Sequence, residues 1–132
     1  MKTKWYQDEL RVFRTMIYEV ARQIGAKVGA VYEPDGTPNF WAAELQGMHS
    51  RFYVLRSFDD HWAFSRFFEP RTCRLEFIDV PEAADVLRLF GKQPMSKSDL
   101  EVPLQSRLGM GRYEIKYWKP AIQGDILFNW WD

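Results

Sequence analysis

The clearest pattern in the chain is an apolar stripe with helical spacing near the N-terminus. Six apolar residues follow one another at intervals of four or three: Tyr6, Leu10, Phe13, Ile17, Val20 and Ile24. This spacing places them on one face of an α-helix. Thr3 is a suitable N-cap, and Gly25 can end the helix in the left-handed conformation. The sequence therefore predicts a helix over residues 4–24 whose striped face packs against a core.

Short strand-like runs separated by turn residues follow the helix. They are Lys27–Glu33, Asn39–Leu45, Arg51–Phe58, His61–Phe68 and Thr72–Asp79. Pro and Gly between residues 34 and 38, the pair Asp59-Asp60, and residues 69–71 supply the reversals. Consecutive strands joined by short turns pair antiparallel with their neighbours. The pattern predicts five antiparallel strands in a meander.

The last third of the chain has weaker patterns. Pro81 fits the first turn of a short helix that Gly91 ends. Residues 92–111 form a long polar stretch, which in a compact domain is a functional loop or a weakly structured excursion. Alternating residues at Tyr113–Tyr117 predict a further strand, and apolar spacing over residues 122–131 predicts a short docked helix.

These elements define an α+β fold. An N-terminal helix packs on a five- to six-stranded antiparallel sheet, with two further short helices, in a single domain of residues 1–132. The order of elements is similar to that of small bacterial accessory proteins such as secretion chaperones and toxin-immunity proteins. Shared architecture does not by itself dictate function.

The register of the central hairpin decides which side chains share a face. With Asp59-Asp60 as a two-residue loop, Phe58 pairs with His61 and Leu55 with Phe64. The face expected beneath the first helix then carries Tyr53, Leu55, Trp62, Phe64, Phe68, Cys73, Leu75 and Phe77. The opposite face carries Phe52, Val54, Arg56, His61, Ser65, Phe67, Arg74, Glu76 and Ile78. A shift of one residue would exchange the two faces.

The second face mixes large apolar groups with charges, and this mixture suggests a contact surface. Six residues form the predicted partner-binding set: Phe52, Val54, Arg56, Phe67, Arg74 and Ile78. Aromatic and arginine side chains are the usual anchors of protein interfaces. The leading hypothesis is therefore a non-enzymatic protein-interaction module that binds a protein partner or a second copy. The competing interpretation is that residues 92–111 or the Trp-rich terminus cover this face.

A small-molecule carrier is the alternative function. The predicted register places Arg66 on the core side, where a guanidinium needs a carboxylate, carbonyls or an aromatic face. In an inner cavity Arg66 would instead receive an anionic group of a ligand, with Tyr53 and Trp62 lining the cavity.

Candidate reactive residues are few and poorly arranged for catalysis. Asp59-Asp60-His61 is typical of a turn rather than of a metal site, and Cys73 lies mid-strand as an inert thiol. Six Trp, six Tyr and ten Phe dominate the chain instead. We therefore predict no catalytic residues, no metal and no cofactor, and favour a protein that is not an enzyme.

Charge and hydropathy narrow the partners. The chain carries 18 basic and 18 acidic residues, a balance that argues against nucleic-acid binding. Its apolar runs fall far short of the ~20 residues needed to cross a bilayer. One cysteine forms no internal disulfide, so we expect a cytoplasmic protein.

Overall fold

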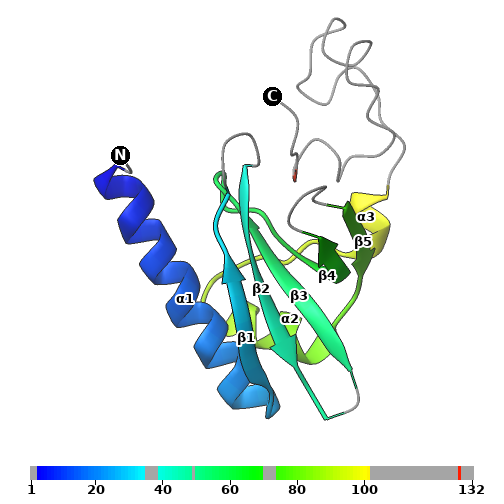
Figure 1. Ribbon diagram of the computed structural model, residues 1–132. Coiled ribbons are helices and arrows are strands. Elements are labelled where there is room, and N and C mark those ends of the chain that lie inside the picture. Colours follow the sequence, from blue (N-terminus) through cyan, green and yellow to red (C-terminus); the bar gives the residue numbers. More distant parts are fainter. Residues whose placement is uncertain (1–2, 35–38, 49, 70–73, 102–127, 129–132) are drawn as a thin grey trace, which may run out of the picture.

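The computed structural model of the 132-residue chain describes residues 3–34, 39–48, 50–69, 74–101 and 128 (Figure 1). Its elements are α1 (Lys4–Ile24), β1 (Lys27–Tyr32), β2 (Phe40–Gln46), β3 (Arg51–Ser57), β4 (Trp62–Glu69), β5 (Arg74–Ile78), α2 (Pro81–Leu89) and α3 (Lys97–Leu100). The predicted α+β arrangement is confirmed. Cys73 and the strand and helix predicted after residue 111 lie outside the described residues.

Helix α1 has the predicted bounds because both of its caps form. The Thr3 hydroxyl accepts a hydrogen bond from the backbone N–H of Tyr6 at 3.1 Å. Gly25 ends the helix with a φ of 75°, a conformation that glycine adopts without strain. All six residues of the predicted stripe face inward, and five of them are buried, with Ile24 partly buried.

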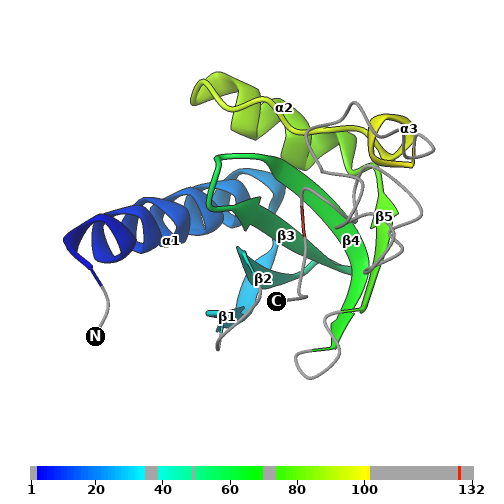
Figure 2. The same ribbon diagram turned by 90° about the horizontal axis from the view of Figure 1, so that it is seen from above.

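The sheet is an antiparallel meander with the strand order β1-β2-β3-β4-β5, as predicted. Helices α1 and α2 lie on the same face of this sheet (Figure 2). Their apolar residues meet the large rings of the central strands, with Phe13 of α1 at 6.1 Å from Trp41 and 5.7 Å from Trp62, measured between ring centroids. The core on this side is therefore largely aromatic.

The predicted register of the central hairpin is wrong by one residue. The loop between β3 and β4 has three residues, Phe58 to Asp60, because the Ser57 N–H donates to the His61 carbonyl at 2.8 Å. Asp60 has a φ of 65°, and three-residue loops of this kind end with a residue in the left-handed conformation. Aspartate tolerates this conformation better than most residues. Val54 therefore pairs with Phe64, and Arg56 with Trp62.

This shift moves side chains between the two faces. Phe52, Val54 and Arg56 lie beneath α1 and α2, together with Trp62 and Phe64, instead of on an open face. The other face carries Tyr53, Leu55, Ala63, Phe68, Leu75 and Phe77, which were expected under α1, apart from Ala63, which was not assigned to a face. The extra loop residue accounts for the side chains of β3. The β4–β5 pairing, which joins Phe64 to Ile78 and shifts in register between Ser65 and Phe68, accounts for Phe68, Leu75 and Phe77.

The face opposite α1 is covered in part by residues from later in the chain. Phe128 is buried there, with its ring centroid 5.9 Å from that of Phe40 and 6.0 Å from that of Phe77. Leu100 of α3 is fully buried in the same cluster. The covering considered from the sequence is thus present, although the side chains on this face differ from those expected.

A buried arginine joins α1 to the sheet. The side chain of Arg56 is only 5% exposed, and its Nη2 donates to Glu9 of α1 at 2.7 Å. Its Nε lies 3.4 Å from Asp60, and its guanidinium lies 5.2 Å from the ring centroid of Trp41. Nη1 has no hydrogen-bond partner among the described residues, so the two carboxylates and the ring must offset most of the desolvation cost.

Replacing Glu9 should destabilise the fold because it removes the closest counter-charge of a buried guanidinium. We expect Glu9→Gln to lower the free energy of unfolding by about 2 kcal/mol. The control is Asp8→Asn, one residue away in α1, where an exposed carboxylate pairs with Lys4 and no measurable change is expected. Urea unfolding at pH 7 measures both variants. Equal stabilities of the two variants would contradict this role of Glu9.

Tyr6 gives the fold a dependence on alkaline pH. The pKa of Tyr6 is raised from 10.0 to about 12, and burial is the largest cause. The hydrogen bond that its hydroxyl donates to Glu33 also raises this pKa, whereas contact with Trp41 lowers it in part. The unfolded chain therefore releases this proton at lower pH than the folded chain. Stability should fall by about 1.4 kcal/mol per pH unit from this group as the pH rises from about 10 to 12. Tyr6→Phe should remove that slope from unfolding curves measured across this range, and an unchanged slope would refute the assignment.

Candidate functional site

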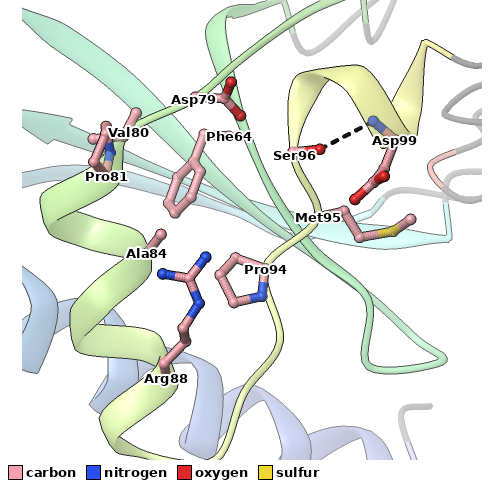
Figure 3. A pocket seen from close by; sticks show the side chains of 10 residues that line it. All are labelled: Phe64, Asp79, Val80, Pro81, Ala84, Arg88, Pro94, Met95, Ser96 and Asp99. Carbon is pink, nitrogen blue, oxygen red and sulfur yellow. Dashed lines mark hydrogen bonds between the residues drawn. The ribbon is translucent and has the colours of Figure 1, made fainter.

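A pocket beside α2 brings several charged side chains of the described residues together (Figure 3). Its volume is about 380 Å³. It is lined by Phe64, Asp79, Val80, Pro81, Ala84, Arg88, Pro94, Met95, Ser96 and Asp99. We refer to it as the α2 pocket.

One wall of the α2 pocket is helix α2 itself. Pro81 starts the helix, as predicted, because its fixed φ and missing N–H suit the first turn. Ala84 is small, and the side chain of Arg88 extends along the helix toward it, beside Pro94 (Figure 3). Phe64 of β4 forms the apolar base between the two walls.

The opposite wall is the segment that leads into α3. The Met95 N–H donates to the Trp62 carbonyl at 2.8 Å, which holds this segment alongside β4. Ser96 caps α3 by accepting a hydrogen bond from the Asp99 N–H at 3.0 Å (Figure 3). Asp79 accepts a hydrogen bond from the Lys97 N–H at 2.8 Å and so ties the end of β5 to the start of α3.

The α2 pocket has more acidic than basic side chains. Its lining includes two carboxylates, Asp79 and Asp99, and one guanidinium, Arg88. Arg88 is already bonded to Asp85 of its own helix at 2.9 Å. The pocket therefore offers an apolar base, supplied by Phe64 and its neighbours, and an acidic rim. Such a pocket favours a cationic group carried on an apolar stem.

The lining does not suggest catalysis. The described lining residues include neither His nor Cys, and the hydroxyl of Ser96 accepts the capping bond. Ser57 and His61 lie close together, with Oγ 3.3 Å from Nδ1, but Ser57 is fully buried in the hairpin. Among the residues that the structure describes, no group of three or more His, Cys, Asp or Glu side chains could hold a metal ion.

Three of the six residues predicted to bind a partner are buried beneath the helices rather than on an open face. Phe52 is 5% exposed and Val54 is fully buried, both in the helix-side core. Arg56 is the buried arginine that binds Glu9. Ile78 is partly buried against the same core, so these four residues do not form an open face.

The remaining two residues of that set lie together at the β4–β5 edge. The Arg74 guanidinium is 5.8 Å from the ring centroid of Phe67. Arg74 is exposed, whereas Phe67 is partly buried against the cluster opposite α1. The structure therefore brings Phe67 and Arg74 together, but on the other face from Phe52 and Val54.

The residues predicted to line a ligand cavity are not brought together. Tyr53 lies in the cluster opposite α1, whereas Trp62 lies in the core beneath α1. Arg66 is 68% exposed and pairs with Glu76 at the surface. The shift of register explains why Tyr53 and Trp62 are separated, and it makes Arg56 the arginine among the rings. Arg66 lines the β3–β5 rim with Phe52, where its side chain is exposed.

Sequence reasoning missed the α2 pocket because its residues come from three separate stretches of the chain, at residue 64, residues 79–88 and residues 94–99. One local signal was present, since Ser96-Lys97-Ser98-Asp99 has a capping serine three residues before an acidic residue. That pattern marks the start of α3, which lies inside the stretch predicted to be a loop. Nothing in the sequence indicates that Asp79 would reach this start.

Comparison of the chain with protein-family models, curated proteins and solved structures gives no match. Within the described part of the chain, no helix is long and apolar enough to cross a membrane. The candidate site therefore stands on its own geometry.

Replacing Asp79 should loosen α3. In Asp79→Ala the Lys97 N–H loses its acceptor, so we expect the amides of Lys97 and Leu100 to exchange with solvent about tenfold faster, the effect of losing one bond to a charged acceptor. Hydrogen exchange followed by NMR measures this change. The amides of α1 serve as an internal reference and should not change, and Ser98→Ala is the matched α3 variant. Unchanged exchange at both positions would show that Asp79 does not hold the pocket wall.

Proposed function

We propose that this protein is a non-enzymatic protein-interaction module, an accessory protein of the immunity- or chaperone-like kind. Its α2 pocket receives a Lys or Arg side chain of a protein partner. The observation that carries the proposal is the pairing of an apolar base with an excess of carboxylates in one pocket. We place the protein in the cytoplasm, where Cys73 would stay reduced.

The shape of the α2 pocket supports a long side chain. Phe64, Ala84 and Pro94 offer contacts for the methylene stem of a Lys or Arg (Figure 3). Asp99 stands at the rim, where it can accept charge-assisted hydrogen bonds from the terminal ammonium or guanidinium. Arg88 stays neutralised by Asp85, so it does not repel the incoming cation strongly.

The structure favours this proposal over the small-molecule carrier. The carrier needed a cavity between α1 and the sheet, but Trp41 and Trp62 are fully buried there and pack on Phe13. The anion-binding role of Arg66 is also lost, because that side chain is exposed and paired with Glu76. A second copy of this chain remains a partner if it presents a basic side chain to the pocket.

A random peptide library tests the proposed function, because it requires no choice of partner in advance. We expect random dodecapeptides displayed on phage and selected on the purified chain to be enriched in Lys or Arg at one position. A synthetic peptide of the enriched sequence should bind Asp99→Asn about fivefold more weakly, the equivalent of ~1 kcal/mol for one surface ion pair. Fluorescence anisotropy measures the affinity, which should also fall as salt is added.

Asp99→Asn removes the charge of the side chain without breaking the α3 cap, because Asp99 takes part in the cap through its backbone N–H. The matched control is Glu19→Gln, a carboxylate of α1 that pairs with Arg22 away from the pocket. It should bind the peptide as the natural chain does. Selected peptides without a basic position, or equal affinities for both variants, would overturn the proposal. Preference for small organic cations over peptides would instead indicate a carrier.

A further inference from the structure

A second pocket adjoins the α2 pocket across the connection between β5 and α2. Its volume is about 300 Å³, and it is lined by Ser50, Arg51, Phe52, Arg66, Ile78, Asp79, Val80 and Glu82. Asp79 and Val80 line both pockets. We refer to the second one as the β3 pocket.

The apolar bases of the two pockets are continuous. Phe52 lines the β3 pocket and Phe64 the α2 pocket, and their ring centroids are 6.0 Å apart in an edge-to-face contact. Ile78, which lines the β3 pocket, pairs with Phe64 in the sheet. The two pockets therefore open on either side of a single stretch of backbone, Asp79-Val80.

The two pockets differ in charge. The β3 pocket has Arg51, Arg66 and Glu82 in its lining, besides Asp79, whose carboxylate is counted in the α2 pocket. Each arginine also has a counter-charge outside the lining, Glu44 at 3.4 Å from Arg51 and Glu76 beside Arg66. Because both arginines have a counter-charge, the β3 pocket over Phe52, Ile78 and Val80 suits an uncharged apolar side chain rather than an ion.

We propose that the two pockets form one bipartite site that binds an extended segment of the partner protein. A basic side chain enters the α2 pocket, and an apolar side chain two positions away enters the β3 pocket. This inference rests on the proposed function and adds the second determinant of the partner.

The spacing follows from the dimensions of extended chains. The segment must cross the width of one backbone, and neighbouring extended chains lie about 4.8 Å apart. Side chains two positions apart in an extended chain point to the same side and are separated by about 6.6 Å, whereas side chains three positions apart point to opposite sides. A spacing of two positions therefore carries the segment across Asp79-Val80 with one side chain in each pocket.

The same dodecapeptide library tests the bipartite site. Peptides selected on the natural chain should show an apolar residue two positions from the basic one. In a synthetic peptide with Lys and Leu at that spacing, replacing Leu with Ala should weaken binding about fivefold. Ser50→Trp, an exposed substitution at the rim of the β3 pocket, should fill this pocket and reduce that effect to less than about twofold. Thr15→Trp, on the exposed face of α1, is the matched control and should leave the fivefold effect in place.

The outcomes separate the two proposals. Enrichment of a basic residue without any apolar preference would overturn the bipartite site and leave the proposed function standing. Loss of the basic preference would overturn both. If Ser50→Trp fails to fold, the Leu and Ala peptides can still be compared on the natural chain. Equal affinities of the two peptides would show that the β3 pocket does not contribute to binding.

Discussion

The left-handed conformation of Asp60 is the constraint on which the rest of the structure depends. It makes the β3–β4 loop three residues long, and the odd number sets the parity of every side chain in β3 relative to β4. Asp60 is held there by three partners, since its carboxylate accepts from the Trp62 indole at 2.7 Å and pairs with Arg56 and Lys92. The loop and the core beneath α1 therefore specify each other.

The buried Arg56 is a consequence of that parity. Val54 and Trp62 both face α1. Arg56 is two positions after Val54 and pairs with Trp62, so its side chain must face α1 as well. A buried guanidinium of this kind contributes little net stability, because desolvation consumes most of the Coulomb energy. Its contribution is to specificity, since α1 can satisfy Arg56 only when Glu9 stands opposite it. An apolar stripe alone would leave the helix free to slide along the sheet.

Local signals in the sequence were enough to predict the helices and strands. They were not enough to predict the register in which the strands pair. The Thr3 and Gly25 caps fix α1, and Pro81 fixes the start of α2, because each acts through its own backbone. The parity of the hairpin depends on one dihedral angle of Asp60, which two adjacent aspartates do not reveal. The error then spread to the faces assigned to Phe52, Val54 and Arg56. The α2 pocket was beyond reach for another reason, because it exists only where Asp79 meets the start of α3.

The position of the two pockets follows from the same architecture. Helix α2 begins directly after β5 and covers the end of the sheet where Phe52 and Phe64 lie, so the connection Asp79-Val80 crosses the edge of the aromatic core. A two-residue connection is too thin to cover both rings, and a hollow opens on each side of it. The α2 pocket is acidic for two reasons. Asp79 lines it while accepting the hydrogen bond from the Lys97 N–H of α3. The Ser96 cap of α3 brings Asp99 to the rim. The residues that fasten α3 to the sheet are thus the ones that give the α2 pocket its charge. The partner recognition that we propose for this pocket would therefore depend on the integrity of this corner of the fold.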